Sequence, residues 1–511
     1  MRHPSICLVL SVAAVAGCAV GPNYRTPQIP TPPQYAAVPT DSAVVTSGSA
    51  SASVDLALWW RALNDPKLDS LIERAISGNP DLTIALDRLQ AARTFEAAVV
   101  GTVLPVAEAS AGAARGTGSD LTRGRAAQSL VSADNDSGWQ HINAIGGFDA
   151  LWELDIFGKY RREIQAARYD TQASLAARNA VLVAVVADVA RAYVDLRGLQ
   201  VRAALLDADL VVLRESLRIV NIRYERGITN ELDVTLATRE LATLEAQAAP
   251  VAAQIQGAKY TIATLLGQYP EDLTQELSAE SMVPGVPDAV DPGVPLQLLR
   301  RRADIQQAER ELGGATARIG IATANLFPSI AVSGAVGFQR QDQGHAPILG
   351  EHIWSAGPSL VWPLLDFGAL DAQVEIADLN TRALLVNYKK TIQQAVREVD
   401  TNLGLYAAQQ VSLGKLDTAL IASQRAVTLA NERYQRGLTD FLNVVDAERQ
   451  EYDIQEEYTN AQVALTQQFI ELYRSLGGGW ENYQSLPPIH RPEPAIIAAF
   501  QRVLSRSDPL K

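Results

Sequence analysis

Cysteine is nearly absent from this chain of 511 residues, which contains only Cys7 and Cys18. A mature chain that begins at Cys18 would have no internal disulfide, although an exported protein could form one. The histidines show no metal-ligand spacing with cysteine, and neither a nucleophile elbow nor a P-loop is present. We therefore expect no enzyme activity, no metal site and no cofactor.

The sequence also lacks an excess of positive charge and a long hydrophobic run. The formal net charge is −13, which argues against nucleic acid as a partner, because nucleic-acid binding needs a basic surface. After the N-terminus no unbroken apolar stretch reaches the length of roughly 18 residues that predicts a transmembrane helix. If the chain spans a membrane, it must therefore do so with β-strands.

Aromatic residues make up only 6 % of the chain, whereas hydrophobic residues as a whole make up 47 %. The apolar surface comes mostly from Ala, Val and Leu, which suits helix-on-helix packing. Leu206, Leu210, Leu213 and Leu217 alternate steps of four and three, which is coiled-coil spacing. The fold class that we expect is mainly α with a small β part.

The N-terminus has the features of a processing segment. Arg2 precedes an apolar run that ends in Val-Ala-Gly-Cys at residues 15–18. Small residues before a cysteine resemble a bacterial lipobox, so residues 1–17 are predicted to be a signal peptide and Cys18 the lipidated residue. An ordinary signal peptide with a chance cysteine is the alternative. Residues 18–55, rich in Pro, Ser and Thr, are predicted to be an extended linker from the anchor.

The rest of the chain is organised around two similar segments, RYERGITNELDVTLATR at 223–239 and RYQRGLTDFLNVVDAER at 433–449. In each, a helical pattern ends at a glycine, Gly227 or Gly437, and another helical pattern starts at once. Glycine ends a helix without a steric penalty. Each segment is therefore predicted to be the tip of a helical hairpin.

The two tips belong to a long internal repeat. Trp152-x-Leu with Phe157-Gly matches Trp362-x-Leu with Phe367-Gly at an offset of 210 residues, and the tips have the same offset. The helical pattern before the first tryptophan, 81–105, matches 304–328 at an offset of 223. We expect a first structural repeat at 56–267, a connector at 268–295, a second repeat at 296–478 and a C-terminal tail at 479–511.

Each repeat is predicted to contain one very long helix and two shorter ones. The long helix, about 158–225, would measure roughly 100 Å, and the helices at 231–266 and 81–105 roughly 54 Å and 35 Å. A long helix must bury its apolar stripe along its whole length. The two shorter helices nearly sum to the long one, so we expect them to lie end to end beside it.

The segments between the short and long helices alternate apolar and polar residues with a period of two. The predicted strands are 106–113, 141–154, 330–339 and 353–364. Apolar outward and polar inward faces with long polar loops are typical of a membrane barrel, and a periplasmic β-sandwich is the alternative. Four strands cannot close a barrel, and open edges cannot lie in lipid. A membrane-spanning form must therefore be an oligomer that shares one barrel.

The chain resembles the TolC/OprM family of outer-membrane efflux channels, in its lipoprotein or NodT branch. The resemblance covers residues 18 to about 480. The residues that carry it are the lipobox, Gly21-Pro22-Asn23-Tyr24, Trp59-Trp60 with Asp65-Pro66, Asn79-Pro80-Asp81-Leu82, the two Trp-x-Leu…Phe-Gly segments and the RYxRG tips.

The resemblance implies a homotrimer in which tandem-repeat hairpins form a trimeric α-barrel above a shared 12-stranded transmembrane β-barrel, with four strands per chain. It implies an outer-membrane exit channel of a tripartite efflux system that conducts drugs and small molecules from the periplasm of a Gram-negative cell. A periplasmic adaptor protein and an inner-membrane pump, of the RND type, are the implied partners, together with outer-membrane lipid. A periplasmic coiled-coil adaptor or scaffold lipoprotein without a pore is the alternative, and fractionation would discriminate between the two.

The resemblance also implies roles for residues at the tips. Leu442, Asp446 and Arg449 share one helix face and match positions that line the periplasmic gate. Arg239 matches Arg449, and Asp233 is the candidate acid of the first tip, where Leu236 replaces the aspartate. An ordinary solvated ion pair is the alternative for Asp446 and Arg449. The residues expected to dock the adaptor at the tips are Arg223, Tyr224, Gly227, Arg433, Tyr434 and Gly437.

Two tryptophans are candidates for membrane-interface aromatics, Trp152 and Trp362. Amphipathic aromatic side chains form girdles at both rims of membrane barrels. Packing between strand and helix is the alternative for both.

Overall fold

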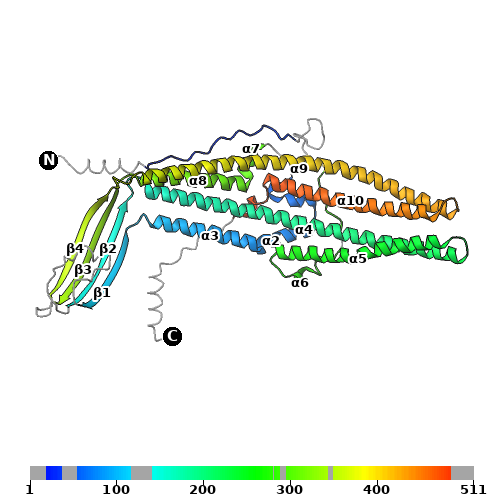
Figure 1. The fold of residues 1–511 in the computed structure, drawn as a ribbon, viewed down its shortest axis with the longest axis horizontal. Coiled ribbons are helices and arrows are strands. Elements are labelled where there is room, and N and C mark those ends of the chain that lie inside the picture. Colours follow the sequence, from blue (N-terminus) through cyan, green and yellow to red (C-terminus); the bar gives the residue numbers. More distant parts are fainter. Residues whose placement is uncertain are drawn as a thin grey trace.

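Two helices of 67 residues each, α4 (Lys159–Glu225) and α9 (Ala369–Gln435), run along the length of the protein (Figure 1). The computed structural model describes residues 19–36, 54–116, 141–279, 281–287, 290, 295–342 and 349–484. At about 1.5 Å per residue each long helix spans about 100 Å. Cys18, the signal peptide and the tail from residue 485 lie outside the described residues.

Each long helix is accompanied by two shorter helices, as the sequence predicts. Helices α3 (Pro80–Gly101) and α5 (Glu231–Leu265) pack beside α4. Helices α8 (Ala303–Ala324) and α10 (Phe441–Leu476) pack beside α9. Both α3 and α8 end four residues before the proline at which the predicted helix stopped, because the residue before a proline is driven away from the helical region.

The shorter helices meet end to end at two equivalent joints. In the first repeat the Asn79 side chain donates to the carbonyl of Leu265, with 2.7 Å between Nδ2 and O. In the second repeat Arg302 Nη1 donates to the carbonyl of Ser475 at 3.0 Å. Adding 223 to 79 gives 302, and adding 210 to 265 gives 475, so the joint is conserved between the repeats although its side chain differs.

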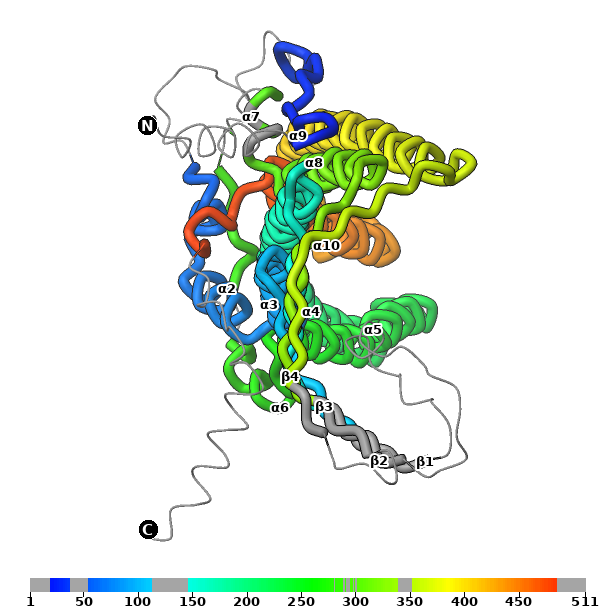
Figure 2. Tube along the Cα trace, turned by 90° about the vertical axis from the view of Figure 1, so that its left-hand side faces the viewer, coloured from blue at the N-terminus to red at the C-terminus, as the bar shows by residue number. Residues whose placement is uncertain are grey.

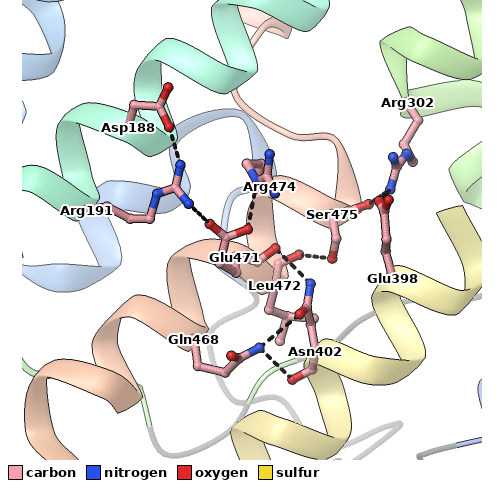
Figure 3. A network of polar contacts seen from close by, with 10 residues as sticks. All are labelled: Asp188, Arg191, Arg302, Glu398, Asn402, Gln468, Glu471, Leu472, Arg474 and Ser475. Carbon is pink, nitrogen blue, oxygen red and sulfur yellow. Dashed lines mark hydrogen bonds and ion pairs between the residues drawn. The ribbon is translucent and has the colours of Figure 1, made fainter. Parts of the chain in front are cut away.

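A polar network surrounds the second joint (Figure 3). Arg302 also pairs with Glu398 of α9 at 2.8 Å and with Asp304 at 2.7 Å. Nearby, Glu471 of α10 accepts from Arg191 of α4 and from Arg474. The network therefore links α4, α8, α9 and α10 at mid-height of the molecule.

The four strands form one antiparallel sheet in the order β1 (Val106–Gly116), β2 (His141–Leu154), β3 (Ser329–Asp342) and β4 (Leu349–Val361). The sheet lies at one end of the helical body (Figure 1). The predicted fourth strand extends to residue 364, whereas β4 ends at Val361. Strand β4 ends there because Val361 pairs with Ser329, the first residue of β3, and β4 has no second neighbour among the described strands.

The small elements pack around the centre of the helical body. They are η1 (Leu56–Leu63), α2 (Pro66–Gly78), α6 (Pro270–Leu273), α7 (Pro295–Arg301) and η3 (Glu481–Tyr483). Trp59 and Trp60 are fully buried, and Trp59 stacks on Tyr473 of α10 with 6.0 Å between ring centres. Sequence periodicity did not indicate that α2 packs against α4.

Residues 19–36 are extended but attached to the helices. Arg162 of α4 donates to the carbonyls of Val20 and Gly21, at 3.1 and 3.0 Å. The Cα of Gly21 packs so closely on Gly320 of α8 that a Cβ would approach to 2.5 Å. Tyr35, near the other end of the segment, is buried. The predicted linker is therefore a strap along the helical body over these residues.

Viewed along the molecule, the long helices form a curved layer instead of a closed bundle (Figure 2). Helix α9 lies at one edge of the layer, and α3 and α5 lie at the other. In the described part of the chain, one helix, α4, contains a segment long and apolar enough to cross a membrane, but half of that segment is buried inside the protein. Helix α4 is therefore a core helix of the curved layer.

Candidate functional site

The sheet has two chemically different faces. The register aligns Phe148 of β2 with Val336 of β3, and Val336 with Trp354 of β4. All three side chains are exposed and lie on the same face. The other face carries small and acidic residues, and there Glu108 of β1 lies opposite Asp149 of β2. This is the alternation that the sequence predicted.

Trp152 and Trp362 lie where the sheet meets the helices. Trp152 Nε1 donates to the carbonyl of Val103 at 3.0 Å, and Trp362 Nε1 donates to the carbonyl of Leu326 at 3.1 Å. Both rings are otherwise exposed. Each tryptophan therefore fixes the turn between a short helix and its strand while presenting an amphipathic ring to the surroundings.

At the opposite end, both hairpin tips have the same backbone geometry. Gly227 and Gly437 have φ values of 70° and 71°. The residue after each glycine donates to the carbonyl of Arg223 or Arg433 at 2.9 Å, and each glycine donates to the preceding tyrosine carbonyl. This is the Schellman arrangement, which closes a helix end through a left-handed glycine.

A contact between the two hairpins lies just above the tips. The guanidinium carbon of Arg223 lies 4.4 Å from the ring centre of Tyr434, and the Tyr434 ring lies 5.2 Å from that of Phe441. Tyr434 is only 8 % exposed, so it is not available to a docking partner in this conformation. The residues that pack in this cluster are Val220, Ala237, Tyr434, Phe441, Val444 and Val445.

The candidate gate residues lie on the other face of α10. Leu442, Asp446 and Arg449 are exposed, whereas Val444 and Val445 are buried. Asp446 accepts from Arg449 at 3.3 Å and from Gln450 at 2.9 Å. Within one chain the three residues therefore form an exposed strip that starts at the tip.

The first tip differs in its acidic residue. Asp233 is half-buried and accepts from Thr229, while its own backbone N–H donates to the Asn230 side chain at 3.1 Å. Asp233 therefore works as part of the cap of α5. Arg239 forms an ion pair with Glu240, with 3.6 Å between Nη2 and Oε2. Leu232, which sequence reasoning missed, is exposed at the position equivalent to Leu442, since 232 plus 210 is 442.

Sequence reasoning also missed an exposed apolar residue on each tip. Ile228 and Leu438 directly follow the two glycines and are 60 % and 64 % exposed. The sequence contained a signal for them, because they occupy equivalent positions, 210 residues apart, in the two tip segments. Each hairpin therefore ends in an exposed apolar side chain.

A cavity of about 140 Å³ lies between the hairpins, and acidic residues line it. Burial raises the pKa of the Glu448 carboxyl to about 7, and burial followed by repulsion from Glu451 raises the pKa of Asp209 to about 6. Ser216 donates to Glu448 at 3.4 Å. Tertiary packing of the two hairpins brings these acids together, although Asp209 belongs to α4 and Glu448 to α10.

Known proteins resemble this chain over nearly its whole length. The family model described as outer membrane efflux protein matches residues 71–268 and 294–478. Nodulation protein T of Rhizobium leguminosarum bv. viciae is 28 % identical over 499 residues, which cover 97 % of each chain. The toluene efflux pump outer membrane protein TtgC of Pseudomonas putida is 28 % identical over 483 residues, covering 94 % of this chain and 96 % of the relative.

Solved structures show the same architecture. The outer-membrane channel OprN superimposes with a TM-score of 0.80 and 34 % identity, covering 91 % of this chain and all of OprN. The outer membrane protein VceC from Vibrio cholerae gives a TM-score of 0.73 at 26 % identity, covering 83 % of this chain. The family model spans most of the chain, and both structures are outer-membrane proteins. This chain therefore belongs to the outer membrane efflux protein family and is an outer-membrane exit channel.

Proposed function

We propose that three copies of this chain form a lipid-anchored efflux duct whose periplasmic tips close as a gate. The observation that carries the proposal is the sheet, which has one apolar face, one polar face and two edges that no other described strand of the chain pairs with. Unpaired edges cannot lie in lipid. Three copies supply twelve strands, enough to close a barrel with the apolar face outward.

The curved layer of helices supports the same assembly. Ile376 and Leu379 of α9 are exposed at one edge of the layer, and Ile84 and Phe95 of α3 are exposed at the other. Long helices need their apolar stripe covered along the whole length. Three curved layers joined edge to edge would form a helical tube that continues the β-barrel.

In that tube, the exposed strip of Leu442, Asp446 and Arg449 would face the axis at the periplasmic end. Three Asp446 carboxylates in a narrow ring would repel one another and favour the passage of cations, as charged rings do in channels. Three Leu442 side chains would form an apolar constriction that resists wetting. Arg239 and Asp233 of the first tip would face the neighbouring strip.

The tips are also the proposed docking surface for a periplasmic adaptor protein that connects the channel to an inner-membrane pump of the RND type. Ile228 and Leu438 offer apolar contacts, and Tyr224 and Arg433 are exposed beside them. Such a surface suits a coiled-coil partner whose helix ends meet the hairpin tips. Because relatives are named for the efflux of toluene and antibiotics, drugs and other small molecules are the proposed cargo.

The strap at residues 19–36 supports a lipid anchor at Cys18. Ala19 packs against Gly158, where the first repeat passes from sheet to helix, and Val20 donates to the carbonyl of Phe157 at 3.0 Å. Successive Cα atoms are about 3.8 Å apart. Lipid on Cys18 would therefore start at the level of the membrane boundary that Trp152 and Trp362 indicate.

Single-channel conductance in planar bilayers tests the proposal. The wild type is expected to show a small, cation-selective conductance. The double variant Asp446→Ala/Arg449→Ala is expected to conduct several-fold more with weaker selectivity. Asp453→Ala, an exposed acid of α10 beyond the strip, is the matched control and should leave conductance unchanged.

Each outcome separates one part of the proposal from the others. A wild type that conducts while the double variant is unchanged would support the duct and reject the gate at Asp446 and Arg449. A protein that neither inserts into bilayers nor conducts, and that is not found in the outer-membrane fraction, would support the periplasmic scaffold instead.

A further inference from the structure

The apolar packing between the two hairpins is interrupted by the acidic cavity of about 140 Å³. On the side toward the tips, Val220 of α4 packs with Phe441 and Val444 of α10. On the side away from the tips, Leu210 of α4 belongs to a second apolar cluster, which Tyr452 of α10 contacts. Between these clusters the hairpins meet through carboxyl groups. Because a buried charge without a partner is costly, this part of the interface depends on the protonation of its acids.

Four carboxyl side chains from three helices line the cavity: Asp209 of α4, Glu240 of α5, and Glu448 and Glu451 of α10. Among the described lining residues Arg449 is the only basic one, and it is exposed and donates to Asp446 at 3.3 Å. Helix α9 contributes Val427 to the lining. The lining therefore has more acidic than basic groups, and the acids come from both hairpins.

The basic residues close to the cavity already pair with other acids. These pairs are Arg239 with Glu240 at 3.6 Å, Arg202 with Glu456 at 2.7 Å and Arg214 with Glu245 at 2.8 Å. Each of these cations is therefore engaged by a carboxylate other than Asp209 or Glu448. In the packed hairpins, loss of charge on these two acids has to come from protonation.

The hydrogen bonds in the cavity point to the same pair. Glu448 accepts from Ser216 at 3.4 Å and also forms a hydrogen bond with Asn431. Oδ2 of Asp209 is buried, and no described residue forms a hydrogen bond with it. An ionised oxygen in that position would lose its hydration without a replacement. We call Asp209 and Glu448 the acid pair.

Protonation of the acid pair is linked to the packing of the hairpins. Burial raises the pKa of Glu448 to about 7, and burial followed by repulsion from Glu451 raises the pKa of Asp209 to about 6. If the hairpins separate, both carboxyls meet water and their pKa values fall toward the ordinary range. Protons therefore favour the packed hairpins at low pH, and this preference is lost as pH rises through about 7.

We propose that the acid pair controls the periplasmic entrance through protonation: the protonated pair keeps the second hairpin packed on the first, and the ionised pair favours separation of the tips. The inference rests on the proposed channel gate and adds the signal to which that gate responds. Arg449 connects the two, because it lines the cavity and also donates to Asp446 of the exposed strip. Ionised Glu448 and Glu451 attract the Arg449 guanidinium away from Asp446.

The size of the effect follows from the change in proton affinity. For Glu448 alone, a pKa of about 7 in place of 4.5 changes the ratio of packed to separated hairpins by up to about 300-fold. Between pH 5.5 and 8 roughly 25-fold of this change takes place. The open probability of single channels in planar bilayers is therefore expected to rise at least tenfold over this interval.

Neutral variants of the same shape test the role of the pair. Glu448→Gln cannot ionise, so its open probability at pH 8 should stay near the value of the wild type at pH 5.5. Asp209→Asn should reduce the pH response in the same direction. Asp207→Asn, at an exposed acid of α4 two residues from Asp209, is the matched control and should keep the wild-type profile. Equal pH profiles for the wild type and Glu448→Gln would overturn the proposal.

The separation of the tips has a readout that does not depend on conduction. Glu225 and Gln435 are the exposed last residues of α4 and α9, and no cysteine follows Cys18, so Glu225→Cys/Gln435→Cys places one spin label on each tip. The labelled chain is diluted with unlabelled copies in lipid nanodiscs. Pulsed electron paramagnetic resonance should show a longer distance between the labels at pH 8 than at pH 5.5. Adding Glu448→Gln should abolish the change.

The two readouts separate this inference from the proposed gate. Tips that separate at pH 8 while the open probability stays constant would support control by the acid pair and reject the gate. Tips that keep one distance at both pH values would overturn control by the acid pair. If Asp446→Ala/Arg449→Ala still opened such a channel, the proposed gate would stand without it.

Discussion

Arg223 of the first repeat lies over the ring of Tyr434 in the second, with 4.4 Å between the guanidinium carbon and the ring centre. A cation over an aromatic face is attracted by the ring, by about 0.5–2 kcal/mol depending on exposure. The contact joins the two hairpins of one chain next to the proposed gate. Its strength therefore helps to set how easily the second tip moves away from the first.

Loss of the Tyr434 ring should open the tips. Tyr434→Ala removes both the ring over which Arg223 lies and a buried aromatic side chain, so a local destabilisation of about 3–5 kcal/mol and a several-fold larger conductance are expected. Tyr434→Phe keeps the ring over which Arg223 lies, so this variant should stay close to the wild type. Conductance in planar bilayers measures both. A closed Tyr434→Ala channel would show that this contact does not hold the tip.

The tip glycines should be required for their backbone conformation alone. A Cβ at Gly227 or at Gly257 of α5 would meet nothing within 4 Å, but only Gly227 has a positive φ, 70°. Gly227→Ala is expected to destabilise the protein by about 1 kcal/mol. Gly257→Ala, the matched control in a helix, should stabilise it by about 0.5–1 kcal/mol. Thermal unfolding followed by circular dichroism measures both, and a shift of the same sign would contradict the prediction.

We expect the joint between α8 and α10 to tolerate asparagine in place of Arg302, because asparagine is the residue at the equivalent joint between α3 and α5. Asn79 caps α3 by accepting from the N–H of Leu82 and also bonds Leu265, whereas Arg302 makes no cap to α8. Arg302→Ala leaves Glu398 without its partner and is expected to cost about 1–3 kcal/mol. Arg302→Asn should recover part of that loss, because asparagine supplies both the cap and the bond to Ser475. Equal melting temperatures for the two variants would show that only the ion pairs matter.

Glu448 should make stability depend on pH. Burial raises the pKa of its carboxyl from 4.5 to about 7, so the folded protein keeps a proton that the unfolded chain releases. The contribution of Glu448 to stability is therefore greatest below pH 4.5 and is lost as pH rises through about 7. The other charged groups at the cavity are Asp209, Glu240, Arg449 and Glu451. Of these, Asp209, whose pKa is raised to about 6, changes stability in the same direction.

Glu448→Gln imitates the protonated acid and should flatten this pH dependence. At pH 8 the variant is expected to be more stable than the wild type by about 1–3 kcal/mol, and the two should converge near pH 4.5. Glu457→Gln, at an exposed glutamate of α10, should leave the wild-type curve unchanged. Melting temperatures between pH 4.5 and 8 provide the measurement. Parallel curves for the wild type and Glu448→Gln would show that Glu448 does not cause the pH dependence.

Much of the fold was readable from the sequence because its signals are local. The bounds of α4 and α5, the two glycine tips and the period of two in β2 follow from residues close together in the chain. The end-to-end arrangement followed from helix lengths alone. The attachment of residues 19–36 did not, because the contacts of Gly21 with Gly320 join segments about 300 residues apart and leave no periodic pattern.

The candidate site was readable only in part. The sequence placed Leu442, Asp446 and Arg449 on one helix face because helical spacing decides that, and the structure shows that this face is exposed. It did not show that Tyr434 is buried beneath Arg223, or that Glu448 and Asp209 share a cavity. Those pairs come from different hairpins, and their burial depends on how the hairpins pack.

The sequence by itself determined the long helices, their approximate lengths and the repeat, since backbone propensity and periodicity act over a few residues. Only the tertiary structure decided which of two equivalent side chains is covered. Phe157 and Phe367 occupy the same position in their repeats, yet one is stacked and the other is 99 % exposed. The reason is physical: burial depends on the neighbour that is present, and a single chain supplies that neighbour to the first repeat alone.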